Sequence, residues 1–481
     1  MKRISLFLVL VLCIVFFAYA QENPATDFEY RGNDDNTGIL ITKYIGRVKN
    51  VRIPRMIEGM PVVSIGDMAF INNQLTSITI PNSVVSIGSG AFRDNQLTSI
   101  TIPNSVVSIG DEAFIGNDLT SVNLPNNLTY IGNYAFIGNL LTSINLPNSL
   151  TYIGNYAFST NRLTRITITD NVDIQPHSFD YISVYDKYIR EGKRQATYNI
   201  TLSTYNDFDI AVLDNSVVEI IKYTGNIEDV NIPERINNLP VIAIGDGAFS
   251  GYLLTSVNFP NGLTHIGNGA FRGSRLTSVN LPNSLTHIGN YAFSTNPLTR
   301  ITITDNVDIQ PHSFYYISVY DKYIREGKRQ ATYNITLSTY NDFDIAILDN
   351  SVVEIIRYRR RTESVNIPER INNLPVIAIG FMAFYDNQLT SLNLPNGLKY
   401  IGNEAFRGSR LTSVNLPNSL TYIGNGAFIS NLLTSVNLFN GLKYIGDYAF
   451  AYNQLTSVII PNSVVNLANN AFDSNVRITR R

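Results

Sequence analysis

The chain has 481 residues, of which 44% are hydrophobic and 15% are charged, and its formal net charge at pH 7 is −2. This length exceeds what one compact domain usually holds, so we expect several domains or an array of repeats. The near-neutral charge argues against a nucleic-acid-binding protein, which requires a basic face.

The first 20 residues have the pattern of a secretory signal peptide. Positive residues at 2–3 precede an apolar run at 4–17 and a small-residue cleavage site at 18–20. The run is short for a membrane span, so an uncleaved anchor is the weaker interpretation, and we expect no span in the mature chain. Cys13, the only cysteine, lies in this run. The exported chain is therefore expected to hold no disulfide and no cysteine-bound metal.

A phenylalanine preceded by alanine recurs every 22 residues within each series along the chain. These phenylalanines are Phe70, Phe92, Phe114, Phe136, Phe158, Phe249, Phe271, Phe293, Phe384, Phe406, Phe428, Phe450 and Phe472. Phe179 and Phe314 continue two of the series one residue early and follow serine, which makes fifteen repeats. Such self-similarity predicts a solenoid, in which each coil buries its apolar edge against its neighbours and the phenylalanines form the core.

The first half of a coil has the pattern of a short strand, as residues 143–147 show. Ile144 and Leu146 alternate with Ser143 and Asn145, which is typical of a strand with one buried face. Pro147 has no amide hydrogen and should end the hydrogen-bond ladder of that strand.

The second half of the same coil has a different spacing. Leu150, Ile153 and Ala157 follow one another at intervals of three and four, which suits a helical turn or a tight irregular segment. Gly154 indicates either a positive φ or a close approach of two backbones. Asn161 is suited to hydrogen-bond the backbone where one coil turns into the next.

The unit L-x-x-I/V-x-L/I-P-x-x-L/V-x-x-I-G-x-x-A-F-x-x-N closely resembles the BspA-like, treponemal-type leucine-rich repeat. The opening of each array is also similar to that family, with Val-x-Ile-Pro at 51–54, 230–233 and 365–368. The resemblance implies an α/β-type repeat solenoid with a parallel β-sheet of 22-residue coils. It also implies a surface-exposed protein with a role in adhesion or host-protein binding, and it does not fix the ligand.

The repeats fall into three arrays separated by hairpin and helix caps. We predict a signal peptide at 1–20, the first array with its N-terminal cap at 21–180, a connecting cap segment at 181–228, the second array at 229–315, a second connecting cap segment at 316–363, and the third array at 364–481. The two connecting segments are near-copies offset by 135 residues. Each has a helical start that Gly192 or Gly327 should end, followed by strand-like runs. Because solenoid ends expose apolar edges, we interpret them as caps that close one array and open the next.

The residues that usually perform catalysis or bind metals are scarce. His265 and His287 occupy one repeat position on adjacent coils, but no third metal ligand is evident. The chain shows no Gly-x-Ser-x-Gly elbow, no cysteine–histidine pair and no phosphate-binding glycine loop. We therefore expect no cofactor and no enzymatic activity. A carbohydrate-active enzyme, which needs two facing carboxylates, is the less favoured alternative.

The outward positions of the predicted strands are the first candidate ligand contacts. They are Ser121, Asn123, Ser143, Asn145, Ser278, Asn280, Ser413 and Asn415. A solvated sheet face is the simplest interpretation of them, but a broad, nearly uncharged hydrogen-bonding face also suits a protein or glycan ligand. Arg165 and Arg300 interrupt the pattern at the ends of two arrays and are candidate specificity residues.

A tyrosine column and a basic cluster are further candidates. The column consists of Tyr130, Tyr152, Tyr400, Tyr422 and Tyr444. Tyrosine is enriched in binding surfaces, although it also fills half-buried repeat positions. The cluster at 357–361 contains four arginines and is either a solvated turn or a contact for an acidic glycan or an anionic lipid headgroup.

These features together predict a secreted or cell-surface, non-catalytic protein that binds an extracellular protein or glycan. The copying of whole arrays would lengthen a binding surface without disturbing any single site. The alternative is a periplasmic structural scaffold without a foreign ligand.

Overall fold

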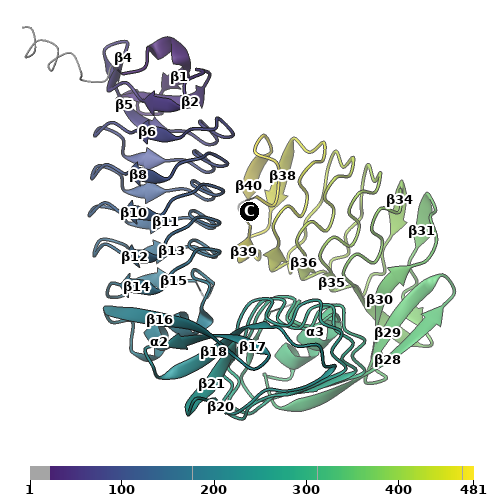
Figure 1. Cartoon of the computed structure of the whole chain (residues 1–481). Coiled ribbons are helices and arrows are strands. Elements are labelled where there is room, and N and C mark those ends of the chain that lie inside the picture. Colours follow the sequence, from purple (N-terminus) through teal and green to yellow (C-terminus); the bar gives the residue numbers. More distant parts are fainter. Residues whose placement is uncertain (1–21, 176, 311, 469) are drawn as a thin grey trace, which may run out of the picture. The chain divides into compact units, whose positions relative to one another are not determined.

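The computed structural model describes residues 22–175, 177–310, 312–468 and 470–481 (Figure 1), so the predicted signal peptide lies outside the described residues. The chain divides into two compact units, one with the residues up to Thr204 together with Ile210–Glu219, and the other with Tyr205–Asp209 and Ile220–Arg481. The boundaries of the three arrays remain a prediction.

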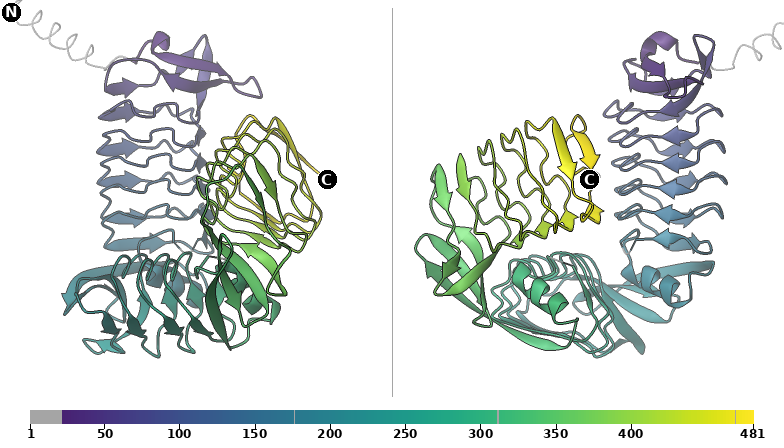
Figure 2. Two further views of the ribbon diagram at one scale, coloured as in Figure 1. Left: turned by 90° about the vertical axis from the view of Figure 1, so that its right-hand side faces the viewer. Right: turned by 180° about the vertical axis from the view of Figure 1, so that it is seen from behind.

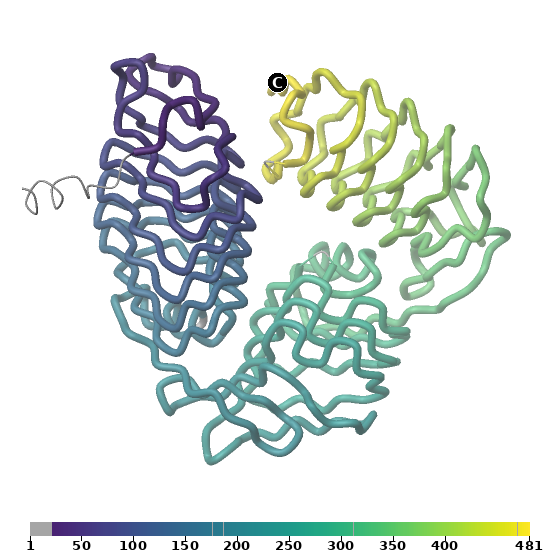
Figure 3. The backbone as a smooth tube through the Cα atoms, turned by 45° about the horizontal axis from the view of Figure 1, so that its top comes forward, coloured from purple at the N-terminus to yellow at the C-terminus, as the bar shows by residue number. Residues whose placement is uncertain are grey.

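The coils of each array stack as parallel turns (Figures 1 and 3) and contribute strands to two ladders. We name them the Ser-Asn ladder and the Tyr-Ile ladder after their commonest residues. The Ser-Asn strands are β3 (Asn50–Arg52), β6 (Ser77–Thr79), β8 (Ser99–Thr101), β10 (Ser121–Asn123), β12 (Ser143–Asn145), β14 (Arg165–Ile168), β19 (Asp229–Asn231), β22 (Ser256–Asn258), β24 (Ser278–Asn280), β26 (Arg300–Ile303), β31 (Ser364–Asn366), β34 (Ser391–Asn393), β38 (Ser457–Ile460) and β40 (Arg477–Arg480).

The Tyr-Ile strands are β5 (Met60–Ile65), β7 (Ser86–Ile87), β9 (Ser108–Ile109), β11 (Tyr130–Ile131), β13 (Tyr152–Ile153), β15 (Asp173–Ile174), β21 (Leu239–Ile244), β23 (His265–Ile266), β25 (His287–Ile288), β27 (Asp308–Ile309), β33 (Leu374–Ile379), β35 (Tyr400–Ile401), β36 (Tyr422–Ile423), β37 (Tyr444–Ile445) and β39 (Asn466–Leu467). The predicted strand at Ser143–Asn145 is confirmed. The helical turn that the sequence allowed after it is not formed, because Tyr152–Ile153 instead pairs with Tyr130–Ile131 of the preceding coil.

The remaining elements cap the arrays. They are the 3-10 helix η1 (Ala25–Asp27), β1 (Phe28–Gly32), β2 (Ile39–Tyr44), β4 (Met56–Ile57), α2 (Ile182–Arg190), β16 (Ala196–Tyr205), β17 (Phe208–Leu213), β18 (Val217–Tyr223), β20 (Arg235–Ile236), α3 (Ile317–Arg325), β28 (Ala331–Tyr340), β29 (Phe343–Leu348), β30 (Val352–Tyr358) and β32 (Arg370–Ile371). The predicted helix ends at Gly192 and Gly327 are confirmed, since both glycines have φ of +76° just after the helices.

The phenylalanine column forms the core, as predicted. Phe136 has no exposed surface, and its ring centroid lies 5.1 Å from that of Phe114 and 5.3 Å from that of Phe158. Such regular stacking follows from the repeat, because each coil places the same ring one ladder spacing from its copy.

In many coils an asparagine three residues after the phenylalanine satisfies the buried backbone at the turn. Asn139 Nδ2 donates to the carbonyl oxygens of Phe114 (2.9 Å) and Phe136 (3.0 Å), and its Oδ1 accepts from the amide of Leu119 (3.0 Å). Asn161 makes the same set of bonds one coil later, as its position in the sequence predicted. These bonds tie consecutive coils together without any disulfide.

Gly154 is required by a close backbone approach. Its φ is not positive, but a Cβ placed there would lie 2.5 Å from the backbone nitrogen of Asn133 in the preceding coil. Of the two roles that the sequence allowed for this glycine, the structure shows the second.

The second connecting segment closes one array and opens the next. Strand β28 pairs antiparallel with β26 at the end of the second array, and β30 pairs parallel with β33 at the start of the third. The hairpin therefore leaves the Ser-Asn ladder and enters the Tyr-Ile ladder. Helix α3 lies across the last coil of its array (Figure 2), where Tyr323 Oη donates to the Thr304 carbonyl oxygen at 2.9 Å.

A buried carboxyl group fixes the start of α3. Glu354 of β30 has no exposed surface, and its two oxygens accept from the amides of Ile317 (3.3 Å) and Ser318 (3.0 Å). These amides have no partner inside the helix, so the carboxyl oxygens of Glu354 supply the acceptors that the first turn lacks.

The third array, like the other two, pairs its Ser-Asn strands only two by two, β31 with β34 and β38 with β40. Its Tyr-Ile ladder runs unbroken from β33 to β39. Among the described residues, 413–415 and 435–437 form no strand, although they repeat the sequence Ser-Val-Asn. The coils of this array are therefore held together more closely at the Tyr-Ile side than at the Ser-Asn side.

Candidate functional site

The Ser-Asn ladder presents its polar side chains to solvent. Ser121 and Asn123 of β10 pair in register with the same positions of β8, and β12 pairs likewise with β14. The eight Ser and Asn candidates are all exposed. Among the described residues, none of these eight side chains has a hydrogen-bond partner within the protein. The coils that carry these eight residues therefore offer rows of uncommitted donors and acceptors, whereas Ser77, Ser256 and Asn393 bond to the neighbouring strand.

The two candidate arginines lie at the edge of this surface. Arg165 of β14 stands opposite Asn199 of β16, and Arg300 of β26 stands opposite Asn334 of β28. Both arginines are exposed, and neither forms an ion pair in the described part of the chain. Each therefore adds a free positive charge where an array ends.

The tyrosine column of the first array is partly open. The rings of Tyr130 and Tyr152 stack at 5.1 Å with an interplanar angle of 8°, and Tyr130 is 38% exposed. Partial burial raises the pKa of both hydroxyls, so both remain hydrogen-bond donors at neutral pH.

The tyrosine column of the third array is largely occupied by the end of the second. Tyr422 is only 6% exposed, and its hydroxyl lies 2.9 Å from Nε2 of His312. The hydroxyl of Tyr400 donates to Oδ1 of Asp321 in α3. Tyr422 also stacks on Tyr444 at 4.5 Å. These tyrosines thus join two arrays, which limits the surface that they can offer to a ligand.

Further contacts complete this junction within the second unit. The side-chain amide of Asn403 donates to the hydroxyl of Tyr291, whose ring packs against Phe381 at 6.2 Å. The ring of His312 stacks on Tyr291 at 5.8 Å, and burial lowers the pKa of His312 to about 3. The imidazole is therefore neutral in the folded protein. Sequence reasoning missed this junction, because His312, Tyr291 and Asn403 follow the ordinary repeat pattern.

His265 and His287 lie side by side on paired strands with ring centroids 5.9 Å apart. Within the residues that the structure covers, no group of three or more His, Cys, Asp or Glu side chains is placed to hold a metal ion. No helix in that same part is both long and apolar enough to cross a bilayer.

Comparison with known families decides the relationship of the chain. The family described as "BspA type Leucine rich repeat region (6 copies)" matches residues 63–185, 219–335 and 357–479. The chain belongs to this family. The matched ranges of the BspA-type repeats cover most of the coils, whereas residues 186–218 and 336–356, which hold most of the two connecting hairpins, lie outside them.

Solved structures of other leucine-rich repeat proteins are similar to parts of this BspA-type chain. One is a leucine-rich repeat protein of Treponema pallidum, 35% identical over 29% of this chain and 66% of the other, with a TM-score of 0.28. A protein of Bacteroides ovatus is 21% identical over 96% of this chain and 100% of the other, with a TM-score of 0.32. The pneumococcal vaccine antigen PcpA is 18% identical over 96% and 87%, with a TM-score of 0.26. A comparison with curated proteins finds no significant match.

Proposed function

We propose that this protein is an exported, non-catalytic binding protein that engages an extracellular protein or glycan through the Ser-Asn ladder. The observation that carries the proposal is the set of exposed Ser and Asn side chains without hydrogen-bond partners in the protein. Rigid strands hold those of the first two arrays at fixed spacing, so a ligand that spans several coils can bond to them with little loss of side-chain entropy.

The nature of this surface favours a polar ligand. Ser and Asn each offer both donors and acceptors, and the charged side chains of the surface are confined to the first and last strands of the arrays, as with Arg52, Asp229 and the terminal arginines. Sugar hydroxyls and exposed peptide groups have the same mixed character. A ligand contact at Arg165 or Arg300 would add selectivity for a carboxylate or a sulfate.

Binding by the purified chain without residues 1–20 tests the proposal. The protein is immobilised and exposed to a panel of extracellular matrix proteins and to a glycan array. A variant changes four ladder positions to alanine: Ser121, Asn123, Ser143 and Asn145. Its matched control changes Asn126 and Asn148, which are exposed but lie outside the strands. We expect saturable binding that the ladder variant weakens at least tenfold, or about 1.4 kcal/mol, and that the control leaves unchanged. No saturable binding across the panel, or equal binding by both variants, would refute the role of the ladder.

The cellular location is part of the same proposal. The export pattern at residues 1–20 and the membership in the BspA-type family support display at the cell surface. Protease treatment of intact cells tests this, since a displayed chain should be digested while a cytoplasmic marker survives. Protection of the chain until the outer envelope is opened would indicate the periplasmic scaffold instead.

A further inference from the structure

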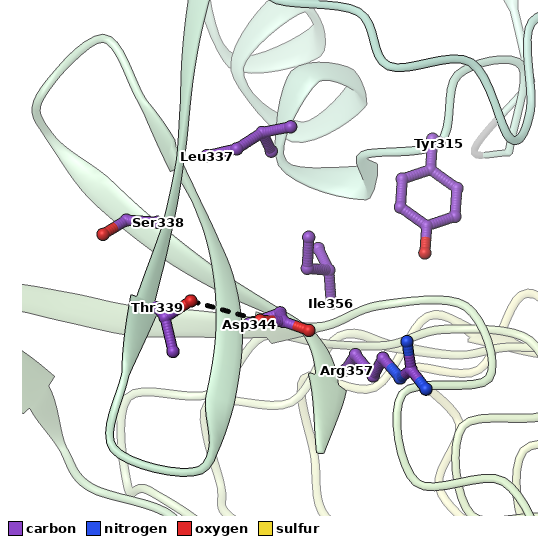
Figure 4. A pocket seen from close by; sticks show the side chains of 7 residues that line it. All are labelled: Tyr315, Leu337, Ser338, Thr339, Asp344, Ile356 and Arg357. Carbon is purple, nitrogen blue, oxygen red and sulfur yellow. Dashed lines mark hydrogen bonds between the residues drawn. The ribbon is translucent and has the colours of Figure 1, made fainter. Parts of the chain in front are cut away.

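A small pocket lies beside the second connecting segment, away from the Ser-Asn ladder of the coils. Its volume is about 340 Å³, at the lower end of the range for small-molecule sites. Leu337 and Thr339 of β28 line one wall, Ile356 and Arg357 of β30 another, and Tyr315 precedes α3 (Figure 4). All of these residues belong to the second unit.

Two of these residues distinguish the second connecting segment from the first. Residues 298–358 repeat residues 163–223 with three differences, which are Tyr315 for Asp180, Ile347 for Val212, and Arg357 for Lys222. Two of the three substituted residues, Tyr315 and Arg357, line the pocket. The changes between otherwise identical copies are thus concentrated in one cavity.

The guanidinium of Arg357 is the uncommitted charge of this pocket. The neighbouring carboxylate of Asp344 is paired with Arg359 at 2.6 Å and accepts from the Thr339 hydroxyl at 3.3 Å. Arg360 is likewise paired, with Asp342 at 2.7 Å. In the described part of the chain, Arg357 forms no ion pair. Because Arg359 replaces Thr224 of the first copy, the acidic wall of the pocket is neutralised and Arg357 remains free for an external anion.

The other walls suit a compact ring. Tyr315 is half-buried, and its ring meets that of Tyr316 edge-on at 5.3 Å, which restricts its orientation. Burial raises the pKa of Tyr315, so the hydroxyl stays protonated and can donate. Leu337 and Ile356 add apolar surface, and the Thr339 hydroxyl adds a polar group. An aromatic face, apolar walls and a planar cationic fork together match a pyranose ring that carries a carboxylate.

We infer that this pocket binds the carboxylate-bearing sugar of an acidic glycan, with Arg357 pairing with the carboxylate and Tyr315 packing on the ring. The two-pronged guanidinium gives paired hydrogen bonds that a lysine cannot give. The site is separate from the Ser-Asn ladder, so it stands even if the ladder binds nothing.

Binding of a hyaluronan tetrasaccharide to the full mature chain, measured by calorimetry, tests this inference. We expect one saturable site that is lost when the carboxyl groups of the same tetrasaccharide are reduced to alcohols. The Arg357→Lys variant should weaken binding about tenfold, and Tyr315→Asp together with Arg357→Lys should abolish it. Both replacements introduce the residues found at the copied positions of the first connecting segment, so they suit the local sequence.

Matched controls separate binding in this pocket from binding at the Ser-Asn ladder and from general anion binding. The four-residue ladder variant should bind the tetrasaccharide as the wild type does, and Ile347→Val, the third difference between the copies, should also be neutral. A sialyl oligosaccharide in place of hyaluronan distinguishes the two classes of acidic sugar, and binding of either supports the inference. Absence of binding to both would overturn it, as would undiminished binding by the double variant. Equal competition by inorganic phosphate or by an acidic peptide would also overturn it, because the pocket would then be a general anion site.

Discussion

Replacement of Phe136 by alanine removes one ring from the middle of the phenylalanine column. The side chain has no exposed surface and stacks on Phe114 and Phe158 at 5.1 and 5.3 Å. An aromatic side chain buries at least about 150 Å², which at about 25 cal/mol per Å² corresponds to about 4 kcal/mol. The cavity that remains adds to this loss where the coils cannot collapse, so we expect a destabilisation of about 3–5 kcal/mol.

Hydrogen exchange of the full chain is the appropriate measurement for Phe136→Ala. A coil of a solenoid contacts mainly its neighbours, so the loss of stability should be local. Peptides from residues 114–163 should exchange about a thousandfold faster, because each 1.4 kcal/mol corresponds to a factor of ten. Peptides from the third array serve as the internal reference and should not change.

The matched control for this experiment is Val107→Ala in the same array. Val107 is 42% exposed, so its truncation should change stability by no more than about 0.5 kcal/mol. If Phe136→Ala leaves the exchange of residues 114–163 at the wild-type rate, the phenylalanine column does not support the coils and the reasoning is wrong.

Three further predictions concern buried polar groups, each measured by urea unfolding. Asn139→Ala leaves the Leu119 amide without its acceptor, while the carbonyls of Phe114 and Phe136 keep Asn117 and Asn161 as donors. The loss should be about 1–3 kcal/mol, whereas exposed Asn145→Ala should be neutral; equal effects would contradict the role of the buried asparagines. Burial lowers the pKa of His312 from 6.5 to about 3. The free energy of unfolding should therefore decrease as pH falls between these values, by at most about 5 kcal/mol. The His312→Gln variant should lack this decrease. Burial raises the pKa of Glu354 from 4.5 to about 7. The free energy of unfolding should therefore decrease as pH rises through that window, by about 3 kcal/mol. A Glu354→Gln variant whose unfolding free energy depends on pH as steeply as that of the wild type would refute this.

The coil itself could be predicted from the sequence, because its determinants are local and repeated. Alternation at 143–146 predicted a strand with one buried face, and the 22-residue spacing predicted the stacked phenylalanines. The role of Asn161 also followed, since a side-chain amide beside each turn can bond the backbone of two coils. Gly154 showed the limit of this reasoning, because only neighbouring coils decide whether a glycine serves its own φ or a close approach.

The sequence by itself determined the repeat unit, the core and the exposed polar ladder, because each coil meets copies of itself at a fixed separation. Only the tertiary structure decided which copies of the same residue are free. Tyr130 and Tyr422 occupy one repeat position, yet Tyr422 is buried against His312, which lies 110 residues away in the chain. The free guanidinium of Arg357 likewise depends on which partner each neighbouring arginine finds. Such contacts follow from how one array packs on another, and a 22-residue period carries no information about that packing.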